Sequence, residues 1–282
     1  MAKRKQSEEE PDSDDDGNQI NLVNVDFDFF DPNPDVDFLA LKRLLLQLFQ
    51  ADAEHLFPHD LADLVLSQPH VGSTVKTDGK ESDPYAILTV LNMHAHQNHA
   101  SMRALIAYAL AKVSANPSFH SALQSLIGPG ALSSPNHLGF VLSERLINMP
   151  MQVVPHMYRM LADELRTAAE QGQPFTFTHF LFFSRTYRLS AEEQAALNAQ
   201  SSPSQSKKRR ASAQTSLPDT SRNGAYSFHH EDALIAQLAS HTLDVPYSHS
   251  QPREEDAFGL DLGLRMMLVP VQKFPDIVSS LA

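Results

Sequence analysis

Residues 23–32 read Val23-Asn24-Val25-Asp26-Phe27-Asp28-Phe29-Phe30-Asp31-Pro32, and we expect the rest of the chain to fold around them. Apolar β-branched and aromatic residues alternate here with polar ones, which is typical of a strand with one buried face. Valine and phenylalanine occupy the face that turns to the core, and carboxylates occupy the other. The prolines that follow end the strand, because proline lacks a backbone donor and restricts the residue before it.

The composition favours a folded, acidic protein. The chain has 282 residues, of which 42% are hydrophobic, so it can build a sizeable core. Its 34 acidic and 22 basic residues give a formal net charge of −12. A negative field of this kind disfavours nonspecific binding of DNA or RNA and favours basic protein partners.

Several function classes are disfavoured by what the sequence lacks. It has no cysteine, and therefore no disulfide, thiolate metal site or cysteine nucleophile. No apolar run approaches the length that spans a membrane, and the charged N-terminus has no signal-peptide core. We therefore expect a soluble intracellular protein that does not interact with membranes.

The domain organisation follows from shifts in composition. Residues 1–19 are rich in like charges and poor in apolar groups, which predicts a disordered acidic tail. Residues 20–282 are predicted to form a single α/β domain. A Ser-, Gln- and Ala-rich stretch at about 191–224 is predicted to be a disordered insertion in that domain.

The apolar periodicity predicts helices and strands that alternate along the whole chain, which favours an α/β fold with a mixed sheet. The first helix is expected to be capped by Asp35 or Asp37. Helices are predicted at about 38–50, 58–65, 101–113, 154–171 and 231–241. Strands are predicted at about 23–31, 70–76, 85–93, 138–142, 175–189, 226–228 and 264–269.

No pattern predicts a catalytic, cofactor-binding or metal-binding site. A histidine cluster at 94–99 has no acidic or thiolate partner nearby to complete a zinc site. The glycine pair Gly128 and Gly130 lacks a P-loop lysine, and Pro129 removes a backbone donor, so we interpret it as a helix-ending turn. The segment 229–232, His-His-Glu-Asp, is interpreted as a strand-to-helix junction.

A basic run lies inside the predicted insertion. It consists of Lys207, Lys208, Arg209 and Arg210. An extended basic run of this kind is what a nuclear import receptor recognises. The alternatives are a solvated charge run and an electrostatic patch for nucleic acid. We expect no direct nucleic-acid binding, because the rest of the chain is acidic.

Three ordered motifs resemble those of a known family. They are the 23–32 stretch, Val71-Gly72-Ser73-Thr74-Val75-Lys76, and Glu144-Arg145-Leu146-Ile147-Asn148-Met149-Pro150-Met151-Gln152. Together they resemble the BCCIP family of eukaryotic nuclear proteins, which includes a fungal nuclear-export member. The segments 180–187 and 226–232 fit the same pattern, so the resemblance covers about residues 20–280.

The resemblance implies both a fold and a role. The implied fold is a single α/β domain with a mixed, mostly antiparallel twisted sheet flanked by helices, similar to the GCN5-related acetyltransferase fold. The implied role is that of an escort in ribosome biogenesis, found in the nucleus and shuttling to the cytoplasm. Its implied partners are a basic large-subunit ribosomal protein and exported protein cargo, such as a phosphatidylinositol phosphate kinase.

The resemblance implies no catalysis and no cofactor, and the sequence agrees. Acetyltransferases of that fold hold the coenzyme A pyrophosphate on a Gln/Arg-x-x-Gly-x-Gly/Ala motif. Aligned on Gly128 and Gly130, the first motif position is Ser125, and Gln124 is one residue out of register. The alternative function is an acyl-CoA-dependent N-acetyltransferase with a divergent phosphate loop.

The partner-binding surface is expected beside the first strand. An acidic surface can pair with the lysines and arginines of a ribosomal protein and release them when RNA competes. Our hypothesis assigns this surface, together with the acidic tail, to Asp26, Asp28, Asp31, Asp35 and Asp37. The alternative for each is a solvated strand face or a helix cap.

Overall fold

The strand β3, Ala86–Asn92, is buried along its whole length and lies inside the sheet. The computed structural model that contains it describes residues 25–68, 71–189, 193, 224–248 and 260–282. Successive side chains of a strand point to opposite faces, so Ile87 and Leu91 enter one core while Leu88 and Val90 enter the other. Its continuous apolar run is therefore typical of a strand covered on both faces.

The described strands form one mixed sheet of eight. The order is β1-β2-β3-β4-β5-β8-β7, and β6 pairs with β5 beside this path. Every neighbouring pair is antiparallel except β4 and β5, which are parallel. The strands are β1 Asp28–Phe30, β2 Ser73–Lys76, β3 Ala86–Asn92, β4 Leu138–Arg145, β5 His179–Arg188, β6 Tyr226–Ser227, β7 His241–Pro246 and β8 Asp261–Pro270.

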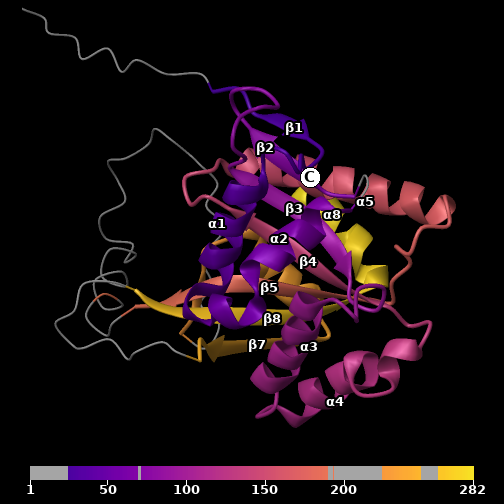
Figure 1. Cartoon of the computed structure of the whole chain (residues 1–282). Coiled ribbons are helices and arrows are strands. Elements are labelled where there is room, and N and C mark those ends of the chain that lie inside the picture. The colour runs from indigo at the N-terminus through magenta and orange to yellow at the C-terminus, as the bar shows by residue number, and fades with distance from the viewer. Residues whose placement is uncertain (1–24, 69–70, 190–192, 194–223, 249–259) are drawn as a thin grey trace, which may run out of the picture.

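Helices cover both faces of the sheet, as Figure 1 shows. The helices α1 to α4 pack with one face around the first core, and α5, α7 and α8 pack with the other around the second. The α-helices are α1 Phe38–Phe49, α2 Pro58–Leu66, α3 Ala100–Lys112, α4 Pro117–Ile127, α5 Val154–Glu170, α7 Glu231–Leu238 and α8 Phe274–Leu281. The short 3-10 helices are η1 Gln50–Leu56, η2 Ala131–Ser133, η3 Met151–Val153 and η5 Val271–Lys273.

The predicted fold class is confirmed: the chain forms a single α/β domain with a mixed, mostly antiparallel sheet. The strand predicted at 85–93 and the helices at 101–113 and 154–171 form within a residue or two of their predicted bounds. The pattern of apolar and polar residues along the chain was therefore sufficient to predict the fold class.

The predicted role of the first strand is wrong. Among the described residues it extends only from Asp28 to Phe30, and it pairs with β2 alone, at one edge of the sheet. Alternation shows that one face of a strand is buried, but it does not show where the strand lies in the sheet. The long strands β5 and β8, which pair over ten residues, occupy more of the sheet than β1 does.

Other differences lie at the ends of elements. The helix predicted at 231–241 ends at Leu238, and His241–Pro246 forms β7 instead. The strand predicted from 175 begins at His179, and a final helix, α8, was not predicted. The predicted tail at 1–19 and most of the predicted insertion at 191–224, including the basic run, lie outside the described residues.

Candidate partner-binding site

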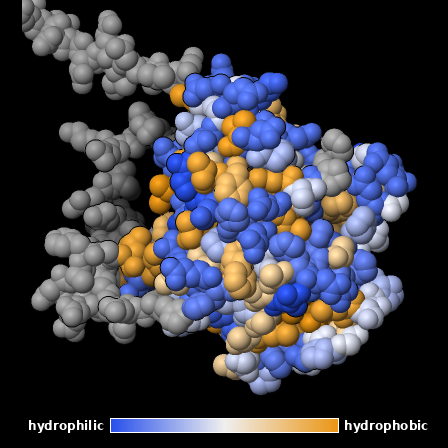
Figure 2. All heavy atoms as spheres, in the orientation of Figure 1, coloured by the Kyte–Doolittle hydropathy of each residue, from blue (hydrophilic) through white to orange (hydrophobic). Residues whose placement is uncertain are grey.

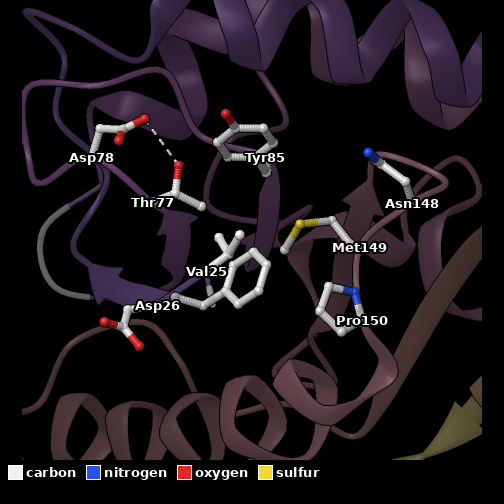
Figure 3. Close-up of a pocket in the computed structure, with 9 residues that line it drawn as sticks. Val25, Asp26, Thr77, Asp78, Tyr85, Asn148, Met149 and Pro150 are labelled. Atoms are coloured by element: carbon white, nitrogen blue, oxygen red, sulfur yellow. Dashed lines mark hydrogen bonds between the residues drawn. The ribbon is translucent and has the colours of Figure 1, made fainter. Parts of the chain in front are cut away.

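A hollow of about 820 Å³ opens beside the edge strand β1. Three segments that are distant in the sequence line it: the residues before β1, the β2–β3 turn, and the loop after β4. Figure 3 shows Asp26 and Asp78 on one side and Met149 and Pro150 on the other. Carboxylate-bearing and apolar residues therefore both line the hollow, and Val25 and Phe27 lie on the same side as Asp26. Its lining residues are Val25, Asp26, Phe27, Thr77, Asp78, Tyr85, Asn148, Met149 and Pro150.

Backbone hydrogen bonds fix the walls relative to one another. The amide of Tyr85 donates to the carbonyl of Val75 at 2.8 Å, which closes the β2–β3 turn. The carbonyl of Tyr85 accepts from the amide of Leu146 at 2.9 Å, and the amide of Met149 donates to the carbonyl of Leu146 at 3.1 Å. The loop after β4 is thereby tied to the start of β3, so the shape of the hollow is set by the sheet.

Four of the five predicted partner-binding aspartates are exposed. They are Asp26, Asp28, Asp31 and Asp35. Of these, Asp26 lines the hollow, and Asp28 follows it two residues later in β1. The amide of Asp35 donates to the side chain of Asn33 at 3.0 Å, which places Asp35 in the turn that leads to α1. These carboxylates give the surface beside the hollow a negative charge.

The prediction that Asp37 contributes to this surface is wrong. Its side chain is fully buried and forms an ion pair with the equally buried Lys76, with Nζ and Oδ1 2.5 Å apart. Its second oxygen accepts from the amide of Asn33 at 2.8 Å, and its side chain makes no capping bond to α1. The pair therefore stabilises the junction of β2 and α1, and Asp37 does not reach a partner.

A second group of buried charges lies where β4 and β5 separate. The two parallel strands pair only from Leu138 to Val141 on β4. Beyond that point Glu144 of β4 accepts from Arg185 of β5 at 3.0 and 3.1 Å, and from Gln47 of α1 at 2.9 Å. In open α/β sheets, ligands commonly bind outside the carboxyl ends of the parallel strands. Here the chain's own side chains bridge the divergence.

The residues around Glu144 determine its charge. Burial alone would raise the pKa of this carboxyl. The neighbouring His229, whose Nε2 lies 3.2 Å from Oε1, and Arg185 outweigh burial and lower the pKa to about 2. The same contact with Glu144 raises the pKa of His229 against the opposing effect of burial. Glu144 is therefore ionised throughout the physiological range.

The neighbouring strand residue, Arg145, pairs with the start of α7. Its guanidinium donates two parallel hydrogen bonds to the carboxylate of Glu231, one of them 2.9 Å long. The next residue, Asp232, accepts from the hydroxyl of Ser184 in β5. The segment 229–232 is thus the strand-to-helix junction that the sequence predicted, and its charged side chains connect α7 to β4 and β5.

We expect Asp232→Asn to stabilise the protein above about pH 6. Burial raises the pKa of Asp232 from 3.8 to about 6, and the charge of Glu231 adds to this rise. A raised carboxyl pKa means that the favourable contribution of the protonated form is complete below pH 3.8 and is lost as the pH rises through about 6. Asparagine stays neutral and keeps an acceptor for Ser184.

Urea unfolding at a series of pH values measures this effect. The difference in unfolding free energy between variant and wild type should be near zero below pH 3.8 and should grow towards neutral pH. The exposed Asp163 provides a control, because Asp163→Asn should show no comparable trend. A difference that does not change with pH would contradict the assignment.

The structure also shows where the glycine pair and the histidine cluster lie. Gly128 is the C-cap of α4, so the glycine pair follows the carbonyl end of a helix, which repels a phosphate. His94 is buried, stacks on His137 with ring centroids 4.7 Å apart, and accepts from the amide of Leu138.

No group of three or more potential metal ligands occurs among the described residues. No described helix is long and apolar enough to cross a membrane.

Sequence reasoning missed the residues that complete the hollow. Asp78, Tyr85 and Met149 come from different segments, and only folding brings them together with Asp26. One signal was available, since the motif 144–152 combines charged residues with exposed apolar ones. That motif contributes Asn148, Met149 and Pro150 to the hollow and also contains the buried charges Glu144 and Arg145.

Three comparisons relate this geometry to known proteins. A family model described as BCCIP matches residues 22–235. The protein bcp1 of Aspergillus fumigatus is 40% identical over 85% of this chain and 77% of its own length. The protein bcp1 of Schizosaccharomyces pombe is 36% identical over 92% of this chain and 89% of its own. The crystal structure of BCP1 from Saccharomyces cerevisiae superposes with a TM-score of 0.62 at 27% identity, covering 96% of this chain and 93% of that one.

Proposed function

The chain belongs to the BCCIP family, and we propose that it is an escort protein. In this proposal it is a chaperone for a basic large-subunit ribosomal protein and an adaptor for nuclear export of protein cargo, such as a phosphatidylinositol phosphate kinase. The family match supports a non-catalytic role at the level of the family. The observation that carries the proposal is the hollow with Asp26 and Asp78 in its lining, beside the exposed aspartates in and around β1.

The charge of this surface fits the chemistry of such a partner. A ribosomal protein presents many lysines and arginines for contact with RNA, and outside the ribosome these groups bind nucleic acid nonspecifically. Carboxylates at 26, 28, 31 and 35 would occupy those groups and speed the encounter by long-range attraction. RNA, with one charge on every phosphate, would then displace the escort during assembly.

Import and export complete the proposed cycle. A nuclear import receptor would bind the basic run Lys207, Lys208, Arg209 and Arg210, which lies outside the described residues. The protein would act in the nucleus, shuttle to the cytoplasm and support ribosome biogenesis.

We propose further that the fold is similar to that of the GCN5-related acetyltransferases and has lost their activity. The divergence of β4 and β5, where an open sheet has room for a cofactor, is bridged by Glu144 and Arg185. In the loop after β4, Pro150 has no backbone donor, and the amides of Leu146 and Met149 already donate to the carbonyls of Tyr85 and Leu146, so fewer donors remain for a pyrophosphate. If the chain were an acetyltransferase, acetyl-CoA would bind the folded protein and raise its melting temperature. We expect no such rise.

A fourfold neutralisation tests the acidic surface. The variant carries Asp26→Asn, Asp28→Asn, Asp31→Asn and Asp35→Asn, all at exposed positions. Immobilised wild type and variant are incubated with total protein extracted from large ribosomal subunits at physiological salt. We expect the wild type to retain one basic protein and the variant to retain about tenfold less of it, because the attraction that stabilises the complex is removed.

A matched control separates this site from general charge. Glu54→Gln, Asp63→Asn, Asp163→Asn and Glu170→Gln neutralise four other exposed acids and change the net charge equally. Retention by this control should equal that of the wild type. Equal loss in both variants, or loss in neither, would refute the assignment of the partner surface to β1.

A further inference from the structure

Residues 146–151, which comprise the loop after β4 and the first residue of η3, carry exposed apolar side chains, and we name them the apolar knob. Ile147 is 76% exposed, Met151 38% and Leu146 36%. Eight large apolar side chains are exposed among the described residues, and three of them lie within these six positions. Single exposed apolar residues are ordinary, whereas a concentration of them marks an interaction site.

Hollows surround the apolar knob on several sides. Met149 lines both the hollow of Figure 3 and a small one of about 80 Å³. Met151 connects the small hollow to a third, of about 340 Å³, against α7 and α8. Leu146 connects it to a fourth, of about 300 Å³, against α1. A protrusion bordered by hollows can be enclosed by a partner on more than one side.

The outer face of α1 extends the apolar surface. Leu39 is 67% exposed and Leu46 is 39% exposed. They lie four residues before and three residues after Arg43, so the three share one face of the helix. Arg43 lines the hollow that Leu146 also lines. Figure 2 shows hydrophobic and hydrophilic side chains intermixed on the face of the molecule that carries α1.

Hydrogen bonds and ion pairs anchor the apolar knob to the sheet. The amide of Leu146 donates to the carbonyl of Tyr85, and the amide of Met149 donates to the carbonyl of Leu146. Directly before the apolar knob, Glu144 and Arg145 are anchored by buried ion pairs with Arg185 and Glu231. A surface that is already ordered loses little conformational entropy when a partner binds, which favours affinity.

Carboxylates flank the apolar knob. Asp26 and Asp78 share a hollow with Met149, and Asp83 shares one with Leu146. Asp83 pairs at the surface with Arg43, where such pairs are weak and readily exchanged. A complementary partner therefore presents large apolar side chains between basic ones.

We propose that the apolar knob is the salt-resistant anchor for the basic partner, which covers it with a segment that combines large apolar side chains with lysine and arginine. This inference rests on the proposed function and adds to it. The aspartates alone would bind any cationic chain, with an affinity that falls steeply with salt. The apolar knob would select among cationic chains, because burial of apolar surface does not depend on ionic strength.

Two synthetic peptides of equal length and charge test this selection. One alternates lysine with serine, and the other replaces half of the serines by leucine. We expect the leucine peptide to bind the wild type about tenfold more tightly, and to keep that advantage in about 1 M salt, where the Debye length is about 3 Å. Equal affinities, or no binding of the leucine peptide, would overturn the proposal.

A pair of matched variants assigns the preference to the apolar knob. Ile147→Ser should abolish the advantage of the leucine peptide and leave the unfolding free energy nearly unchanged, because the side chain is exposed. The control is Leu260→Ser, which removes an apolar side chain that is 44% exposed and lines none of the four hollows. If both variants keep the preference, the anchor is not at Ile147.

The outcomes for the partner and for the apolar knob can be told apart. If capture of the ribosomal protein depends on the aspartates but is unaffected by Ile147→Ser, the proposed function stands and the proposed anchor is refuted. If Ile147→Ser removes the preference for the leucine peptide but the wild type captures no ribosomal protein, the proposed anchor is supported and the proposed partner is refuted.

Discussion

Replacing Glu144 by glutamine is expected to lower the free energy of unfolding by about 3–5 kcal/mol. The carboxylate is completely buried and receives both hydrogen bonds of the Arg185 side chain. Glutamine has nearly the same shape but no charge, so Arg185 and the neighbouring His229 lose their counter-charge in a buried site. A buried charge without a partner is far more costly than a neutral pair would be.

Urea unfolding of the wild type and of Glu144→Gln at neutral pH gives the difference directly. The control is Asp83→Asn, which breaks an ion pair of two exposed side chains and should cost about 0–1 kcal/mol. A loss below about 1 kcal/mol for Glu144→Gln would mean that Arg185 finds other partners and that its pairing with Glu144 is dispensable. Because Glu144 directly precedes Arg145 and the apolar knob, the variant should also weaken partner binding.

Replacing Lys76 by methionine is expected to have an effect of similar size, about 3–5 kcal/mol. The lysine and Asp37 are both fully buried, and the methionine side chain removes the charge while filling most of the space. Asp37 would then be a buried carboxylate that receives only the amide of Asn33. The lysine also donates to the carbonyl of Lys80 at 2.7 Å, and this bond is lost as well.

The double variant Lys76→Met, Asp37→Asn separates the ion pair from the other contacts. Asparagine keeps an acceptor for the amide of Asn33 and carries no charge. We expect the double variant to be more stable than the sum of the single changes predicts, by an interaction free energy of about 1–3 kcal/mol. Additive losses would show that the two charges do not stabilise each other.

The sequence was sufficient for the fold class but not for the arrangement of the sheet. The apolar run at 85–93 can be read as a buried strand because both of its faces are covered. The position of β1 at the edge of the sheet could not be predicted, because its pairing with β2 over three residues produces no recognisable pattern in the local sequence. The strand β7 was missed although Leu243 and Val245 alternate with polar residues, because the preceding helix was extended over His241.

The candidate site was predictable only in part. Local alternation identified Asp26 and Asp28 as exposed, and both are. The burial of Asp37 depends on Lys76, which lies 39 residues further along the chain. The ion pairs of Glu144 and Arg145 join residues 41 and 86 positions apart. Charged residues are usually exposed, so local sequence cannot show that these are not.

The division between buried and exposed charges connects the fold to the proposed role. The buried ion pairs of Asp37 and Glu144 act within the fold: the first joins β2 to the start of α1, and the second lies directly before the apolar knob. The aspartates at 26, 28, 31 and 35 stay at the surface. The structure thus presents a surface on which carboxylates and apolar side chains lie close together.

The most direct test of the escort role is capture from cell lysate with this protein as bait, washed at moderate salt and quantified by mass spectrometry. An escort should retain one basic large-subunit ribosomal protein in an amount close to that of the bait. A broad set of basic proteins that disappears as the salt is raised would contradict the escort role, because it would show that the negative charge attracts cations without selecting a partner.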